Sequence, residues 1–159
     1  MLDVHLARLC KYLRMVGLDC LWKSDYSDEE LRSISSAEKR FLLTRDRVLF
    51  EKADPDFAYY VQAILPQEQL EEVVKNFQLG KWIRNGEHFL SRCLECNTLV
   101  KSLQMGQLPE SVPESIKVRH NEFFFCPTCQ RVYWKGSHFD RTKEWLKTVS
   151  DADPDTRFA

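Results

Sequence analysis

The chain has 159 residues, of which 43% are apolar and 30% are charged, and these fractions are ordinary for a folded globular protein. This length allows one domain of ordinary size or two small ones. No run approaches the roughly eighteen apolar residues of a membrane span, and the charges within residues 1–17 exclude a signal peptide. The net charge of −1 is unevenly distributed, since residues 1–80 hold 11 basic and 14 acidic side chains and residues 81–149 hold 11 and 7. The basic excess of the second part is the pattern expected for an anionic partner.

The N-terminal segment predicts a helix. Apolar residues recur at helical spacing from Val4 to about Met15, and Gly17 supplies a C-terminal stop. Three basic residues are predicted on the opposite side of this helix: Arg8, Lys11 and Arg14. Only residues 1–3 remain for the buried strand that should precede the helix. Either these residues form a short N-terminal stub of a strand, or the chain is a fragment of a longer protein, which is the interpretation we favour.

The rest of residues 1–80 alternates between strand-like and helical patterns. Strands are predicted at 20–22, 41–44 and 57–62. Helices are predicted at 28–39, at 48–52 and at 66–79. Ser27 or Asp28 can cap the first of these helices, and Pro66 is well placed to start the last. The alternation predicts an α/β fold, with a parallel sheet flanked by helices.

The pattern changes after residue 80. Residues 81–89 read as a connector, and residues 92–138 are organised around two Cys-x-x-Cys pairs. Between the pairs, residues 102–115 hold two prolines and predict a long exposed arm, and the segments 120–127 and 131–134 predict a β-hairpin. A helix is predicted at 138–149, with Trp145, Leu146 and Val149 on one face. We therefore expect an α/β domain at 1–80, a β-rich part with a C-terminal helix at 81–149 and a disordered tail at 150–159.

The two cysteine pairs predict a zinc ribbon. Two such turns bring four thiolates together as a tetrahedral S4 site for one Zn²⁺: Cys93, Cys96, Cys126 and Cys129. Four thiolates leave no open position, so the predicted ion is structural, and His138 is expected at a helix start or on the surface. The alternative is two unrelated pairs of reduced thiols. Without a secretory signal, metal is favoured over disulfides, and we expect a reducing compartment, the cytoplasm or also the nucleus.

Four aspartates follow the predicted strands, where ligands collect in an open parallel sheet: Asp3, Asp25, Asp28 and Asp46. Carboxylates that meet there could hold Mg²⁺ or Mn²⁺ and activate water for attack on a phosphodiester. The alternative is that they are solvated loop acids and helix caps. Arg45 and Arg47 flank Asp46 and are candidate phosphate contacts, or else ordinary surface charges.

These motifs occur in one order that resembles a known family. The runs LDVHLARLCKYLRMVGLDC, DYSDEEL, LLTRDR, EQLEEVVKNFQL, RCLECN and FFFCPTCQRVYWKGSH, spread over about residues 1–140, are similar to the Mut-seven C-terminal domain. That resemblance implies a PIN-like nuclease fold joined to a zinc ribbon. It also implies a place at the C-terminus of Nibbler-type 3′–5′ exoribonucleases, which trim the 3′ ends of small RNAs. By the same resemblance, Asp3 and Asp46 match family acidic positions, and the segment with Asp25 and Asp28 carries another.

Three functions follow as hypotheses. The first is an RNA-binding accessory domain of an exoribonuclease, which holds single-stranded 3′ ends through basic and aromatic side chains. Strand alternation predicts Arg131, Tyr133 and Lys135 on the exposed face, with Tyr133 as the base-stacking residue and Trp134 in the core. The second is a metal-dependent PIN-type endoribonuclease. The third is a protein-interaction module that contacts the exonuclease domain or an Argonaute-type protein through residues 102–115.

Overall fold

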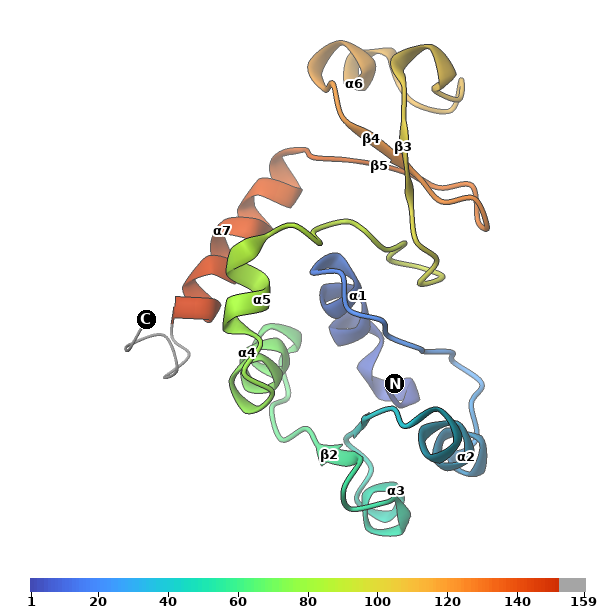
Figure 1. Ribbon diagram of the computed structural model, residues 1–159, viewed down its shortest axis with the longest axis vertical. Helices are drawn as coiled ribbons and strands as arrows, with labels where there is room; N and C mark the ends of the chain where they lie inside the picture. Colours follow the sequence, from blue (N-terminus) through green and yellow to red (C-terminus); the bar gives the residue numbers. More distant parts are fainter. Residues whose placement is uncertain (152–159) are drawn as a thin grey trace.

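The computed structural model describes residues 1–151, with the side chains of His138 and Asp151 excepted. The prediction for His138 therefore lies outside the described side chains, and residues 152–159 of the predicted tail lie outside the described chain. Figure 1 shows a small antiparallel sheet at one end of the molecule and a short parallel sheet with two helices at the other. Four helices, α1, α4, α5 and α7, lie between these ends.

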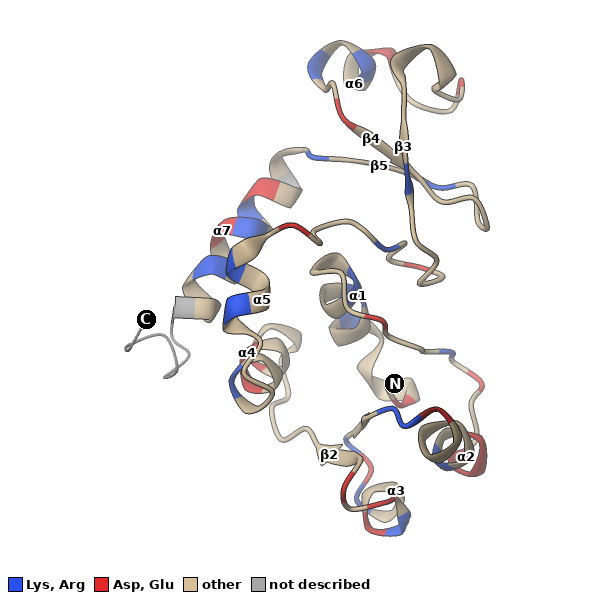
Figure 2. Ribbon diagram, viewed as in Figure 1, with Lys and Arg blue, Asp and Glu red and all other residues tan. Residues whose placement is uncertain are grey.

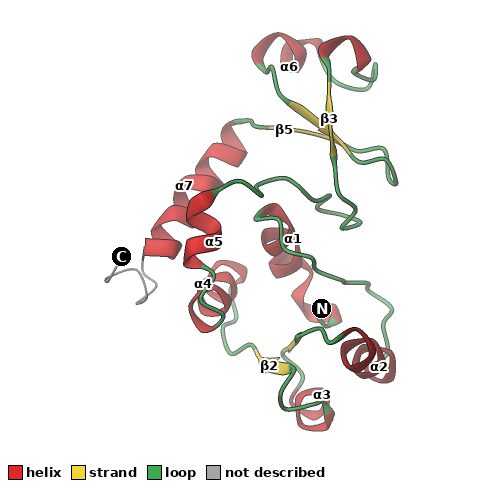
Figure 3. Cartoon of the chain, viewed as in Figure 1, coloured by secondary structure: helices red, strands yellow, loops and turns green. Residues whose placement is uncertain are grey.

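The chain is a mixed α/β protein, as predicted, and Figure 3 colours its elements by type. The first part contains η1 (Val4–Leu6), α1 (Ala7–Met15), α2 (Asp28–Glu38), β1 (Leu42–Thr44), α3 (Arg47–Lys52), β2 (Ala58–Tyr60) and α4 (Pro66–Asn76). The second part contains α5 (Gly80–Asn85), β3 (Lys101–Leu103), η2 (Met105–Gln107), α6 (Glu114–Arg119), β4 (Phe123–Phe125), β5 (Val132–Trp134) and α7 (Ser137–Asp151). None of the helices that the structure describes has the length and apolar character that crossing a bilayer requires.

The parallel sheet is small. Strands β1 and β2 pair in parallel, and Leu2 adds a single parallel bridge to Leu43 of β1, so the N-terminal stub lies beside β1. The strand predicted at 20–22 is wrong, although Leu21 accepts one hydrogen bond from the N–H of Leu2 (3.0 Å). The reason is that side chains occupy the backbone groups of Cys20: its N–H donates to Asn97 Oδ1 and its carbonyl accepts from Arg14 Nε.

Local signals explain the helix ends. Ser27 and Glu30 form a reciprocal capping box at the start of α2, as the predicted cap position requires. Gly17 follows α1 with φ +86°, and a Cβ there would lie 2.5 Å from the Cβ of His88. This glycine therefore stops the helix and also lets the segment after α5 pass against it.

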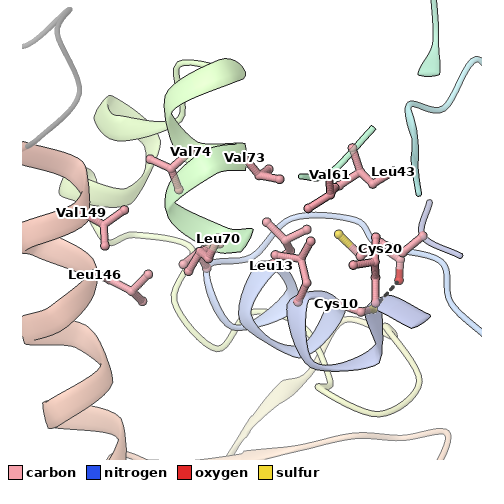
Figure 4. Packing of buried hydrophobic residues seen from close by; sticks show 14 of the residues in the cluster. Cys10, Leu13, Cys20, Leu43, Val61, Leu70, Val73, Val74, Leu146 and Val149 are labelled. Atoms are coloured by element: carbon pink, nitrogen blue, oxygen red, sulfur yellow. Dashed lines mark hydrogen bonds between the residues drawn. The ribbon is translucent and has the colours of Figure 1, made fainter. Parts of the chain in front are cut away.

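The main core crosses the middle of the molecule, where α1 packs against α4 and α4 packs against α7. Figure 4 shows its side chains, with Leu13 of α1 facing Leu70 and Val73 of α4. Residues 81–89 are not simply a connector, because α5 occupies their first half and packs beside α7. Leu146 and Val149 of α7 join this same cluster, so the core takes residues from both sides of the predicted boundary at residue 80.

The second part forms a three-stranded antiparallel sheet with strand order β3-β4-β5. The predicted hairpin is confirmed as β4 and β5, in which Phe124 pairs with Tyr133. The predicted exposed arm is wrong in part, since Ser102 lies in β3 opposite Phe124 and Val112 is buried. The C-terminal helix is confirmed as α7, and it extends through Ser150, which is buried.

Candidate functional site

The four predicted cysteines come together in space. Within the described residues, they are the one group of three or more His, Cys, Asp or Glu side chains whose ligand atoms all lie within 4.8 Å of one another. The Sγ atoms of Cys93 and Cys129 are 3.4 Å apart, and those of Cys96 and Cys126 are 3.3 Å apart. All four are free thiols.

This group fits one zinc ion. Sulfur atoms bound to Zn²⁺ at about 2.3 Å in a tetrahedron are separated by somewhat less than 4 Å, which is near the spacing seen here. The N–H groups of Cys96 and Cys129 point at the sulfurs of Cys93 and Cys126, both at 3.5 Å. Asn97 and Gln130, each just after the second cysteine of a pair, have positive φ of 69° and 59°, which turns both loops in the same way. Burial raises the pKa of the Cys129 thiol to about 12, and a bound Zn²⁺ would ionise it.

Tyr133 faces the cysteines and not open solvent. Its phenolic oxygen lies 3.1 Å from Cys93 Sγ, and Cys93 is fully buried. Burial, followed by the nearby Cys93, raises the pKa of Tyr133 above its ordinary value. The predicted alternation of core and exposed residues is not seen in β5, since Val132, Tyr133 and Trp134 are all half-buried. The prediction that Tyr133 is an exposed stacking residue is wrong, because its face of the sheet is the one that looks toward the metal site.

The first cysteine pair is docked on α1 by a buried arginine. Arg14 is only 3% exposed and donates to the carbonyls of Cys20 (2.9 Å), Leu94 (3.0 Å) and Glu95 (2.7 Å). The prediction that Arg14 lies on an exposed basic face is therefore wrong. Each residue turns an α-helix by about 100°, so Arg14 is displaced by about 120° from Arg8 and approaches the side of Cys10.

Two further side chains complete this docking, and the sequence analysis missed both. Asn97 donates to Asp19 Oδ1 at 2.6 Å, and Arg92 donates to the carbonyls of Gly17 (3.3 Å) and Asn97 (3.1 Å). Burial acts to raise the pKa of Asp19, but hydrogen bonds from Arg40 and Asn97 outweigh it and hold that pKa below its usual value. No local pattern marks the contacts of Asn97 with Asp19 and of Arg92 with Gly17, because they join residues 78 and 75 positions apart. The polar network fixes the zinc turn to the α/β part.

Asp3 is buried at the carboxyl end of the N-terminal stub. Its Oδ1 accepts from the N–H of His5 at 2.8 Å, which caps η1. Its Oδ2 accepts from the hydroxyl of Thr44 and from the N–H of Arg45 at 2.8 Å. The carboxylate is 2% exposed, so these donors satisfy a charge that has little access to water.

The other three aspartates differ in their surroundings. Asp46 caps α3 through the N–H groups of Val48 and Leu49, and its own N–H donates to Thr44 Oγ1 at 2.9 Å. Thr44 thus links Asp3 and Asp46. Asp25 and Asp28 are exposed, with Asp28 in the first turn of α2. In the described chain, the four carboxylates do not gather into a metal-binding group.

The predicted basic residues fall into two classes. Arg45 donates to the carbonyls of Val61 (3.2 Å), Gln62 (2.8 Å) and Ala63, so it clamps the chain after β2. Lys135 pairs with Glu122 and lies over the ring of Phe124. Both cations are engaged within the protein. Lys135 is exposed, as are the remaining cations of the predicted set apart from the buried Arg14: Arg8, Lys11, Arg47 and Arg131.

Lys11 and Arg131 come from opposite ends of the chain but share one neighbour. Lys11 Nζ lies 2.6 Å from Glu95 of the first cysteine pair. The hydrogen bond from Lys11, followed by the charges of Arg131 and Arg14, lowers the pKa of Glu95. Arg8 lies one turn before Lys11 on α1 and is exposed. We call Arg8, Lys11 and Arg131 the α1–ribbon surface. In Figure 2, basic colour on α1 faces the loop that carries the first cysteine pair.

Comparison with known proteins identifies the family. A search of curated proteins and a search of solved structures found no match. The family model described as the Mut7-C RNAse domain matches residues 1–146, which is nearly the whole chain, and it associates the chain with RNA and nucleases. This agrees with the order of motifs, the four-cysteine group and the α/β fold. The chain therefore belongs to the Mut7-C RNAse domain family.

Proposed function

We propose that this protein is an RNA-binding domain of a ribonuclease and that single-stranded RNA contacts the α1–ribbon surface. The observation that carries the proposal is the pairing of exposed Lys11 on α1 with Glu95 of the first cysteine pair, within a chain that matches an RNase-domain family. The charge of Arg131, which lies 120 positions after Lys11, also acts on Glu95. Exposed Lys and Arg side chains attract the phosphate backbone without regard to sequence.

The organisation of the surface supports binding rather than chemistry there. Arg8 and Arg131 are exposed and have no ion-pair partner among the residues that the structure describes. The zinc site beneath them has four protein ligands and no open position, so its role is to hold the surface in place. Asp3 and Asp46 cap helices, so their lone pairs are largely used within the fold.

Charge removal tests the proposal. The double variant R8Q/R131Q should bind single-stranded RNA more weakly than the wild type. The plot of log affinity against log salt concentration should become less steep by about 1.4, because each phosphate contact on a single strand contributes about 0.7 and two contacts are removed. The matched control K75Q/R119Q removes two exposed cations from α4 and α6 and should retain the wild-type slope. Equal slopes for all three proteins would overturn the proposal.

The finer proposal concerns the parent protein. We propose that this domain accompanies a 3′–5′ exoribonuclease and helps to hold the 3′ ends of small RNAs, with the exonuclease domain or an Argonaute-type protein as its neighbour. The support is the resemblance of the whole series of motifs to the domain of that type. The test compares two 5′-labelled RNAs of the same sequence, one with a free 3′ end and one with a blocked 3′ end. A domain that holds 3′ ends should bind the RNA with the free 3′ end more tightly.

A second candidate is a metal-dependent ribonuclease. Its support is the Thr44 hydroxyl at the carboxyl end of β1, which donates to the carboxylate of Asp3 and accepts from the backbone N–H of Asp46. If Mg²⁺ or Mn²⁺ binds there, it would supply activated water, and Asp3 and Asp46 would hold it. Purified protein with Mn²⁺ should then cleave RNA, and D46N should abolish cleavage while D25N does not. Cleavage that survives D46N would rule out this site.

A further inference from the structure

The groove between α3 and the free edge of β2 has no role in the proposed surface. Figure 1 shows α3 beside β2 at the end of the molecule away from the zinc ribbon. The volume of the groove is about 680 Å³, and its lining comes from α3, β2 and the residue after β2: Arg47, Phe50, Glu51, Ala58, Tyr59, Tyr60 and Gln62. Sites for small molecules usually have volumes in this range. The groove runs along β2, since all three residues of that strand line it.

Aromatic rings and one cation meet in this groove. The rings of Phe50 and Tyr60 lie 5.8 Å apart, and the guanidinium of Arg47 lies 5.6 Å from the centre of the Tyr60 ring. No ion pair of Arg47 is formed among the described residues, although Glu51, one turn further along α3, lines the same groove. The guanidinium of Arg47 is exposed and can contact an anion. Tyr59 also lines the groove, and its hydroxyl donates to Glu72 of α4 at 2.9 Å.

The edge of β2 adds backbone donors and acceptors. Leu42 donates to the carbonyl of Phe57, and Val61 donates to the carbonyl of Thr44, so alternate residues of this segment face β1. The N–H and C=O groups of Ala58 and Tyr60 therefore point to the other side. In the described chain no strand pairs with that side. These groups can read the hydrogen-bonding edge of a planar ligand.

We infer that this groove is a subsite for one unpaired nucleotide of a bound RNA: the base contacts Tyr60 and Phe50, and its phosphate contacts Arg47. The inference rests on the proposed RNA-binding function and adds a base-dependent site to it. Aromatic rings beside a free cation are the combination that binds unpaired bases. An extended peptide is less favoured, because β2 offers an edge of only three residues.

The test compares intact single-stranded RNA with the same RNA carrying abasic positions. Y60L should weaken binding of intact RNA by between about 5-fold and about 100-fold, the range of one lost base stack, and should not change binding of abasic RNA. R47Q should weaken binding of both RNAs. Y60W should retain affinity for intact RNA, which separates stacking from a loss of folding.

Another cation–π pair, away from the groove, supplies the control. Lys23 lies 5.3 Å from the centre of the Tyr26 ring, and neither residue lines the groove. Y26L and K23Q should bind both RNAs as the wild type does. The subsite would be overturned if Y60L lost the same affinity for intact and for abasic RNA. It would also be overturned if Y60L lost no affinity, which is the result expected if the edge binds a peptide. Either result would leave the proposed function intact. A wild type that binds no RNA would overturn both.

Discussion

The phenolic oxygen of Tyr133 lies 3.1 Å from Cys93 Sγ, so the zinc site has a side-chain neighbour in addition to its backbone N–H groups. When Cys93 is a thiolate, the phenol can donate to it and reduce the excess negative charge of four thiolates around Zn²⁺. Groups that hydrogen-bond to metal ligands raise affinity for the metal.

Y133F should therefore weaken zinc binding by about tenfold without unfolding the protein. The measurement is competition with a chelator of known zinc affinity. Y26F removes a phenol on the α/β part, where Tyr26 packs against another cluster, and should leave zinc affinity unchanged. Identical zinc affinity in Y133F and wild type would show that the contact has no effect on the metal.

Arg14 should be the main stabilising link between α1 and the first cysteine pair. R14M would leave the carbonyls of Cys20, Leu94 and Glu95 without their donor, and we expect a loss of about 2 kcal/mol in unfolding free energy. Urea unfolding with zinc present measures it. R8M, on the same helix but exposed, should change stability by less than about 0.5 kcal/mol. Comparable losses in the two variants would contradict the docking role.

Asp3 should contribute to the stability of the fold rather than to a binding surface. D3A removes the acceptor of the buried Thr44 hydroxyl and of the partly buried N–H groups of His5 and Arg45, and this should cost about 3 kcal/mol. Thermal or urea unfolding is the readout. D25A, at an exposed position, should behave like the wild type. A D3A protein as stable as D25A would argue against a structural carboxylate.

The docking network should also weaken in acid. Since the pKa of Asp19 is held below its usual value of 3.8 in the folded protein, its contribution to stability is present above that value and is lost as pH falls through the folded pKa. D19N should thus be less stable than wild type at pH 7, and the difference should shrink as pH falls below about 4. Urea unfolding at several pH values measures the gap, and a gap that is constant with pH would contradict the assignment.

Local patterns predicted much of this molecule. The capping box of Ser27 and Glu30 and the four cysteines are defined by short spacings, so their structures follow from neighbouring residues. The sequence predicts the wrong surroundings for Arg14 and Tyr133, because both side chains contact residues that are distant in the sequence. Helical and strand periodicity predicts which residues lie on the same face of an element. It does not predict that the docked zinc turn packs against that face. The segment 20–22 failed as a strand for the same reason, since Asn97 and Arg14 occupy the backbone of Cys20.

The most direct test of RNA binding at the α1–ribbon surface is the affinity of E95Q for single-stranded RNA. Glu95 is the acid beside Lys11 and Arg131, so its neutralisation should strengthen binding. Glu144 accepts from Lys147 at 2.7 Å much as Glu95 accepts from Lys11 at 2.6 Å, which makes E144Q the matched control with unchanged affinity. Tighter binding by E95Q alone is the predicted result. Unchanged or weaker binding by E95Q, or equal gains in both variants, would contradict the proposed RNA surface.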